Sequence, residues 1–167
     1  MPRRQKKVFS YKRFSSGKQY GNTSIARQSS SFADAFEQIY KATGYNIGEM
    51  FVDEGVSAFH GGHATKGQFS VFMDAVRQKR KIKKGDLLAV ESISRFSRDN
   101  PLFSLGILTE LVYKFGIKIH FIDFPSVPVP LDENNFESYS KIVFDESHRV
   151  RAESRQRQTW SLKAVET

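Results

Sequence analysis

The chain has 167 residues, a length that suits one domain, and its formal net charge is +8 because 26 Lys and Arg outnumber 18 Asp and Glu. It has no cysteine, which excludes disulfides and thiolate metal sites. No apolar run is long enough to span a membrane, and the N-terminal M-P-R-R-Q-K-K lacks the apolar core of a signal peptide. We therefore expect a cytoplasmic protein with no membrane contact. The cationic surplus favours nucleic acid as a partner, although solubility alone would also account for it.

The first structured stretch, residues 8–19, is V-F-S-Y-K-R-F-S-S-G-K-Q, which predicts a strand that breaks into a polar loop at Ser15. Side chains alternate along a strand, so Arg13 and Ser15 project to the same side. Serine is a weak nucleophile unless a base or a positive charge assists it. The planar fork of arginine suits the oxygens of a phosphate. The stretch therefore indicates a hydroxyl placed to attack a phosphoryl group, and a solvated strand edge is the alternative.

The next part of the chain predicts a helix over 23–43 and a strand over 45–52. Residues 53–67 are rich in glycine and lack periodicity, which predicts a loop. His60 and His63 lie three apart in this loop, but without a nearby cysteine they do not indicate a zinc site.

A second helix follows, and the basic run 77–84, R-Q-K-R-K-I-K-K, closes it and is expected to face solvent. Its buried side is predicted from the helical spacing of Phe69, Phe72, Met73 and Val76. The strand over 87–91 is apolar enough to lie inside a sheet. It leads into S-I-S-R-F-S-R-D, in which Arg95 and Arg98 are three apart and would align in a helical or tight turn.

A third helix begins at Pro101, which suits a first turn, and ends before Gly116. Its predicted buried stripe consists of Leu105, Leu108, Leu111, Val112 and Phe115. A fourth strand is predicted over 117–122, and the three prolines within 125–132 predict an extended connection. A long last helix is predicted from residue 133 or 134 to Trp160.

Strands and helices alternate along the chain, which predicts an α/β fold with a mostly parallel sheet and helices on both faces. In such sheets ligands gather at the carboxyl ends of the strands. Ser15, the loop that begins at Asp53, and the turn with Arg95 and Arg98 all follow strand ends. They can therefore converge, and three arginines around one serine would form a phosphate cage.

Three separated blocks of this sequence resemble, in the family's order, the catalytic domain of the serine recombinases of the resolvase and invertase family. The first is Y-x-R-x-S-S-x-x-Q at 11–19. The second is D-x-G-x-S at 53–57, followed by K-G-Q-F at 66–69. The third is G-D-x-L-x-V-E at 85–91, followed by R-x-x-R at 95–98. The match covers nearly the whole chain and looks most like the large, integrase-type members.

The resemblance implies a resolvase-like catalytic domain over 1–133, with a mostly parallel sheet of four to five strands, and a long C-terminal helix over 134–167 for dimerisation and DNA contact. It also implies a site-specific recombinase of a mobile genetic element, prokaryotic or phage-encoded, that integrates or rearranges DNA. Ser15 would attack a DNA phosphodiester and leave a 5′-phosphoserine link. The implied partners are double-stranded DNA and further copies of the chain, as a homodimer and as a tetramer in the synaptic complex.

The family uses no metal and no cofactor, so arginines are expected to stabilise the charge that a metal ion stabilises elsewhere. The implied catalytic residues are Ser15, Arg13, Arg95, Arg98, Gln19 and Ser57. The implied supporting residues are Tyr11, Asp53, Lys66 and Ser94. The family usually has Asp at the position of Ser94, and a carboxylate there would orient an arginine better than serine does. Lys66 replaces the family's loop arginine and keeps the charge but loses the fork.

The last helix permits two interpretations. Its first half carries Phe136, Tyr139, Val143 and Phe144, and its second half carries Arg149, Arg151, Arg155 and Arg157. A solvated helix held by pairs such as Glu153 with Arg157 would fray before Trp160. We favour a helix that projects from the domain, packs its apolar half against the same helix of a partner chain, and lays its arginines along DNA phosphates.

Two other functions compete with recombination. A non-catalytic module would keep the recombinase fold for DNA binding or oligomerisation, and Ser94 favours it, whereas the intact set of Tyr11, Arg13, Ser15 and the paired arginines opposes it. A nucleotide-binding doubly wound domain is disfavoured because no G-x-G-x-x-G follows the first strand. No separate DNA-binding domain is visible, so we expect either part of a longer recombinase or a short form that relies on another chain.

Overall fold

The computed structural model describes residues 3–14, 34, 37–38, 44–54, 67–93 and 100–166. Its elements in chain order are β1 (Lys7–Phe14), β2 (Asn46–Glu54), α3 (Gln68–Arg77), β3 (Leu87–Val90), α5 (Pro101–Thr109), the π-helical turn η2 (Glu110–Lys114), β4 (Lys118–Phe121) and α6 (Phe136–Glu166). Of the helix predicted over 23–43, only residues 34, 37 and 38 are described, and they are helical.

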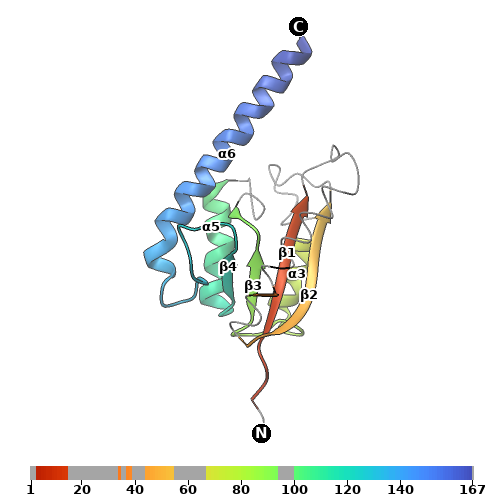
Figure 1. The fold of residues 1–167 in the computed structure, drawn as a ribbon, viewed down its shortest axis with the longest axis vertical. Coiled ribbons are helices and arrows are strands. Elements are labelled where there is room, and N and C mark those ends of the chain that lie inside the picture. The colour runs from red at the N-terminus through yellow and green to blue at the C-terminus, as the bar shows by residue number, and fades with distance from the viewer. Residues whose placement is uncertain are drawn as a thin grey trace.

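The sheet has four strands in the order β2-β1-β3-β4, and each neighbouring pair is parallel (Figure 1). The predicted mostly parallel α/β sheet with helices and a long C-terminal helix is therefore confirmed. Because the strands are parallel, one edge of the sheet collects all their carboxyl ends and the opposite edge collects all their amino ends. We call these the carboxyl edge and the amino edge.

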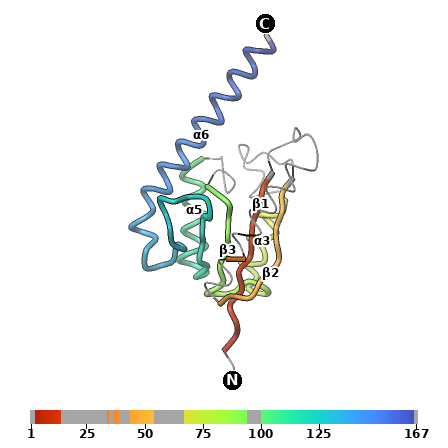
Figure 2. Tube along the Cα trace, in the orientation of Figure 1, coloured from red at the N-terminus to blue at the C-terminus, as the bar shows by residue number. Residues whose placement is uncertain are grey.

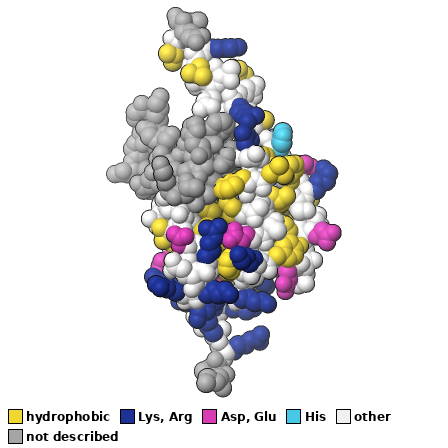
Figure 3. Space-filling view, turned by 180° about the vertical axis from the view of Figure 1, so that it is seen from behind, with side chains coloured by type: hydrophobic (Ala, Val, Ile, Leu, Met, Phe, Trp, Pro, Cys, Tyr) yellow, Lys and Arg dark blue, Asp and Glu magenta, His cyan; other side chains and the backbone are white. Residues whose placement is uncertain are grey.

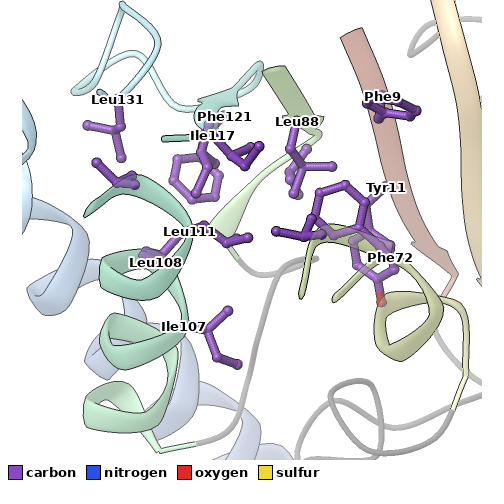
Figure 4. Close-up of a cluster of buried hydrophobic side chains, with 14 of the residues drawn as sticks. Phe9, Tyr11, Phe72, Leu88, Ile107, Leu108, Leu111, Ile117, Phe121 and Leu131 are labelled. Atoms are coloured by element: carbon purple, nitrogen blue, oxygen red, sulfur yellow. The ribbon is translucent and has the colours of Figure 1, made fainter. Parts of the chain in front are cut away.

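The main core lies between one face of the sheet and the helices α3, α5 and η2 (Figure 4). Phe9, Tyr11 and Leu88 reach this core from the strands, because alternate residues of a strand point to the same face. Val8, Leu87 and Ala89 are buried on the opposite face. All four residues of β3 are buried, as the apolar composition of this strand predicts for a position inside a sheet.

The predicted buried side of α3 is confirmed, whereas that of α5 and η2 is confirmed in part. Leu108, Leu111 and Val112 are buried, Leu105 and Phe115 are only partly buried, and Ile107 is buried in addition. In α3, the buried residues are Phe69, Phe72, Met73 and Val76. Pro101 occupies the first turn of α5, and the side chain of Asn100 caps it by accepting a hydrogen bond of 2.9 Å from the backbone N–H of Leu102. Gly116 has a φ of 66°, a left-handed conformation that suits glycine at the end of this helix.

Two segments expected to be surface connections contribute to the core. Ile82, inside the basic run 77–84, is 1% exposed, so this run faces solvent with its cations but not with its single apolar residue. The proline-rich segment is more than an extended connection, because Leu131 and Ile119 exchange two backbone hydrogen bonds of 3.0 and 2.7 Å. This pairing buries Val127 and Leu131 against the open side of β4.

The long helix α6 has a docked half and a projecting half. Phe136, Val143 and Val150 recur every seven residues and are buried, and the ring of Phe136 meets that of Tyr113 edge-on at 5.5 Å between centroids. Packing of Phe136 and Val143 against a partner chain is therefore wrong, because the chain's own core already covers both side chains. Val150 is the last buried residue of the helix, most residues of 151–157 still line cavities with the domain, and the end of the helix projects beyond it to Glu166 (Figures 1 and 2).

None of the helices that the structure describes combines the length and the apolarity needed to span a bilayer.

Candidate active site

The strand order places the candidate site at the carboxyl edge between β1 and β3. The chain passes from β1 to β2 on one side of β1, and β3 then lies on its other side. Ligands of open α/β sheets bind at such a reversal of strand order, outside the carboxyl ends of the strands. Ser15 is the residue that follows the end of β1. Seven of the predicted site residues lie outside the described residues: Ser15, Gln19, Ser57, Lys66, Ser94, Arg95 and Arg98.

Arg13 is the one predicted catalytic cation within the described residues, and it lies at this edge. It lies next to the last residue of β1, its register partner on β2 is Asp53, and it is only 2% exposed. Strand alternation puts Arg13 on the same face as Tyr11 and Phe9. Since an arginine side chain does not lose its proton in proteins, this position holds a fixed positive charge two residues before Ser15.

Asp53 connects three elements below the site. Its carboxylate is buried and accepts hydrogen bonds from the Tyr11 hydroxyl at 2.9 Å and from the backbone N–H groups of Gln68 at 2.6 Å and Phe69 at 3.3 Å. The last two N–H groups belong to the first turn of α3, where a negative charge also meets the positive end of the helix dipole. The loop expected to begin at Asp53 begins later, because β2 continues through Glu54.

Gly67 is a part of this arrangement to which the sequence pattern assigned no role. Its φ is 104°, a conformation that favours glycine. A Cβ atom at this position would lie 2.6 Å from Oδ1 of Asp53. Glycine therefore lets the Asp53 carboxylate approach the first turn of α3. The available signals were its place in the block K-G-Q-F at 66–69 and its position directly before an apolar helical pattern.

Tyr11 is a structural donor and not a base. Its side chain is fully buried, and its ring meets Phe69 edge-on at 5.0 Å between centroids. Burial, and then the negative charge of Asp53, hold the pKa of Tyr11 well above its ordinary value. The phenol therefore stays protonated and donates to Asp53, in keeping with its predicted supporting role.

The four arginines of α6 separate into two groups. Arg149 donates to Glu146 and Glu153, and Arg157 lies 3.8 Å from Glu153. The hydrogen bond that Arg149 donates to Glu146 raises the pKa of Arg149 above its ordinary value. These two arginines line a cavity of about 280 Å³ together with Ser92 and Asp123, which follow β3 and β4. Their charge is thus partly neutralised at the carboxyl edge.

Arg151 and Arg155 occupy the other side of the helix. With Phe144 and His148 they line a groove of about 360 Å³ against the start of α5. A spacing of four residues keeps Arg151 and Arg155 on one face of α6. The four arginines predicted to contact DNA therefore form two pairs on different sides of α6.

Within the described ranges, no group of three or more histidine or acidic side chains is placed to hold a metal ion.

Comparison with known proteins agrees with this arrangement. A family model described as "Resolvase, N terminal domain" matches residues 8–165. An uncharacterized protein of Escherichia coli K12, YbcK, is 39% identical over 115 residues, which are 68% of this chain but only 22% of that protein. The chain thus spans about a fifth of the length of this curated relative.

Two solved structures share the fold. A resolvase family site-specific recombinase from Streptococcus pneumoniae aligns with a TM-score of 0.56 at 18% identity and covers 95% of this chain and 99% of that one. The N-terminal catalytic domain of TP901-1 integrase aligns with a TM-score of 0.52 at 15% identity and covers 92% and 99% of the two chains. Since the family model spans nearly all of the sequence, the chain belongs to the resolvase family of serine recombinases and corresponds to the family's N-terminal domain.

Proposed function

We propose that this chain is the catalytic domain of a site-specific DNA recombinase in which Ser15 is the nucleophile. The observation that carries the proposal is the position of Arg13, a buried cation that lies two residues before Ser15, at the carboxyl edge where the strand order reverses. A phosphodiester that reaches this edge would meet a hydroxyl group and a fixed positive charge together.

The proposed reaction exchanges one phosphate ester for another. The Oγ atom of Ser15 attacks the phosphorus, a serine–phosphate bond forms at the 5′ end, and the bond to the 3′ oxygen breaks. The proton of the serine hydroxyl leaves, and the departing 3′ oxygen takes up a proton to become a hydroxyl. The same steps in reverse join a new pair of ends, so the bond energy is retained and no cofactor is required. Arg13, with Arg95 and Arg98, would stabilise the added negative charge of the transition state.

The surroundings of Arg13 support its role as a positioned cation. Asp53 lies opposite it in the register of β1 and β2, and Asp53 is itself held by Tyr11 and the start of α3. Asp53 therefore ties β1, β2 and the start of α3 together beside Arg13. The remaining proposed residues are Gln19, Ser57, Lys66 and Ser94, and they stay assignments from the family motifs.

We further propose that the projecting half of α6, residues 151–166, contacts DNA, whereas residues 136–150 belong to the catalytic domain. Phe136, Val143 and Val150 tie the docked half to the core. Arg151 and Arg155 remain as the pair that can follow DNA phosphates, and Trp160, Leu162 and Val165 are exposed large apolar side chains that a second copy of the chain could cover. The proposed assemblies are a homodimer and a tetramer that holds two DNA sites.

A covalent adduct tests the proposed nucleophile. The protein that carries this chain is incubated with labelled duplexes from the DNA that flanks its gene and is then denatured. We expect protein-linked 5′ ends with the wild type and with Ser16→Ala, and none with Ser15→Ala, which should still bind DNA. Arg95→Ala and Arg98→Ala should each slow adduct formation about a hundredfold or more. An adduct that survives in Ser15→Ala would overturn the assignment.

The same experiment separates the non-catalytic alternative. If the wild type binds the duplexes but forms no adduct, the fold serves DNA binding alone, and Ser94 is the first position to examine. Ser94→Asp restores the residue that the family usually has there, so an adduct that appears only in this variant would identify Ser94 as the reason for lost cleavage.

A further inference from the structure

The amino edge of the sheet carries a concentration of cations that the proposed active site does not use. Two short segments meet there, residues 3–7, R-R-Q-K-K, and residues 79–84, K-R-K-I-K-K. Every Lys and Arg in both segments is exposed. In Figure 3 the dark blue side chains gather at this end of the molecule, and Figure 1 shows that the N-terminus lies there, opposite to the end of α6. We call these two segments the basic pole.

A buried carboxylate holds the two segments together. Asp86 has a fully buried side chain, and it accepts two hydrogen bonds from the Arg4 guanidinium at 3.0 and 2.9 Å. It also accepts from the backbone N–H groups of Lys7 and Lys83, each at 2.9 Å. The first segment is therefore fixed against the second by charge-assisted hydrogen bonds, and the cations form an ordered array on a rigid base.

Two lysine side chains of this array pack against the backbone of glycine residues. A Cβ atom on Gly85 would lie 3.1 Å from Cε of Lys6, and one on Gly116 would lie 2.7 Å from Cγ of Lys84. Both glycines have positive φ, of 92° and 66°. The stems of Lys6 and Lys84 thus lie across glycine backbone, which leaves their ammonium groups at the surface.

Lys79 is placed in the array by an unusual backbone conformation. It has a φ of 53° directly after the end of α3, a position at which helices usually have glycine. It is the one residue other than glycine with positive φ in the described part of the chain. A lysine held there in place of the more favourable glycine indicates a use for its charge.

Acidic side chains compensate part of the charge of the basic pole, and Asp132 and Glu133 line a concavity with Lys6 and Lys84. Among the described residues, the only ion pairs of the two segments are Arg4 with Asp86 and the exposed pair of Lys81 with Glu49. Arg4, Lys7, Arg80, Lys81 and Lys83 surround a surface concavity of about 560 Å³. Crowded like charges repel one another, and a polyanion that lies across them removes that repulsion.

We propose that the basic pole binds the phosphate backbone of a second DNA duplex, apart from the duplex at the candidate active site. The eight residues of β1 separate the two edges by about 25 Å, at roughly 3.3 Å a residue. The projecting half of α6 leaves the domain at the carboxyl edge and leads away from the pole (Figure 1). A duplex held by Arg151 and Arg155 would therefore leave the basic pole open to another segment.

The array matches a duplex better than a membrane surface. Helices and patches that lie on membranes combine cations with apolar side chains that enter the lipid. Of the large apolar residues that are exposed in the described ranges, only Ile47 lines the concavity. Duplex DNA presents one negative charge for every 1.7 Å of its axis and needs no apolar contact. The choice of DNA among polyanions rests on the proposed function.

Salt-dependent binding tests the proposal on the chain as it stands. The anisotropy of a labelled duplex of arbitrary sequence is measured from 50 to 200 mM KCl. Arg80→Gln/Lys83→Gln should weaken binding at 100 mM KCl about tenfold or more and make the log–log salt slope shallower by about 0.9 for each lost contact. Lys141→Glu removes the same two units of charge from the start of α6 and should leave the slope as in the wild type. Both exchanged side chains are exposed, so circular dichroism and the urea midpoint should not change.

A bridging assay tests whether the pole binds a second duplex. An immobilised duplex saturated with the chain is offered a second, labelled duplex. The wild type should capture the label, and both Arg80→Gln/Lys83→Gln and Arg151→Gln/Arg155→Gln should lose capture, each through one of the two surfaces. Lys141→Glu should capture as the wild type does. The assay detects binding and not cleavage, so a failure of the nucleophile assignment and a failure of this proposal give different results.

Three outcomes would overturn the proposal. One is an unchanged affinity and salt slope in Arg80→Gln/Lys83→Gln. Another is an equal loss in Lys141→Glu, which would show that net charge acts and not the basic pole. The third is a result in which Arg80→Gln/Lys83→Gln no longer binds phosphatidylserine vesicles but still binds DNA as the wild type does. That result would make the basic pole a lipid-binding surface.

Discussion

The two edges of the sheet are built around the same device, a buried aspartate that accepts several hydrogen bonds, but they use it differently. At the carboxyl edge Asp53 accepts from a buried phenol and from the start of α3. At the amino edge Asp86 accepts from a half-exposed guanidinium and from two backbone N–H groups of surface segments. A buried carboxylate must be satisfied at either place, because an unpaired charge in the interior is very unfavourable.

The difference lies in the donors and decides what each edge can do. Asp53 fixes buried elements next to Arg13, a buried cation whose register partner on β2 is Asp53, which suits one chemical step at one point. Asp86 fixes surface segments whose remaining cations all face water, which suits a long ligand that is held but not altered. The comparison suggests that the carboxyl edge is the more sensitive of the two to substitution.

Removal of each aspartate gives the largest expected effects. Asp53→Ala leaves buried donors on Tyr11 and at the start of α3 unsatisfied and should lower the free energy of unfolding by about 3–5 kcal/mol. Asp86→Ala should cost about 2–3 kcal/mol, because water can reach Arg4, which is 37% exposed. Urea unfolding at pH 7 measures both. An Asp86→Ala variant that is less stable than Asp53→Ala would show that the amino edge, and not the carboxyl edge, is the more sensitive to substitution.

Alanine at the two glycines beside these aspartates gives the next effects. Both Gly67 and Gly85 have positive φ, so alanine at either should cost about 1–2 kcal/mol in backbone strain. At Gly67 the new Cβ would also displace the Asp53 carboxylate, which adds about 1–2 kcal/mol, whereas at Gly85 it meets only the flexible end of Lys6. Thermal or urea unfolding should therefore show that Gly67→Ala is less stable than Gly85→Ala. Equal losses of stability would show that backbone strain alone matters.

The phenol at the carboxyl edge makes stability depend on alkaline pH. The pKa of Tyr11 is raised in the folded state, so the unfolded chain loses this proton first as the pH rises past about 10. Stability should then fall by up to about 1.4 kcal/mol per pH unit, and Tyr11→Phe should remove this component. Urea unfolding at pH 8, 9.5 and 10.5 measures the slope. Tyr113→Phe, which changes an exposed phenol, is the matched control, and the same slope in both variants would exclude Tyr11 as the cause.

The smallest expected effect is a gain in stability from a substitution at the amino edge. Lys79→Gly relieves about 1–2 kcal/mol of left-handed strain and costs about 0.5–1 kcal/mol in the flexibility of the unfolded chain. The net gain of about 0.5–1 kcal/mol should be visible as a higher urea midpoint, together with weaker DNA binding. Gln78→Gly, at a residue with ordinary helical φ, should instead lower stability by a similar amount. A destabilised Lys79→Gly variant would mean that the lysine has a structural role.

The sequence alone was sufficient for the family, the parallel sheet and the approximate positions of the strands and helices that the structure describes. Strands 87–91 and 117–122 and the helices around Phe72 and Leu108 were predictable because apolar spacing is a local property that one stretch of chain reports by itself. The three motif blocks are local in the same sense. They assign Ser15, Arg95 and Arg98 to the site, and that assignment remains a prediction for residues outside the described ranges.

Tertiary structure decided whatever depends on residues far apart in the chain. Tyr11 and Asp53 are 42 residues apart, and Lys7 and Asp86 are 79 apart, so no local pattern could show that each aspartate is an acceptor at one edge of the sheet. The burial of Ile82 could not be predicted either, because its neighbours in sequence are cations that face solvent. The same holds for α6, whose apolar residues could equally have packed on a partner chain until α5 and η2 were seen to cover them. Local patterns give the period of a buried face, but only the folded chain supplies the surface that buries it.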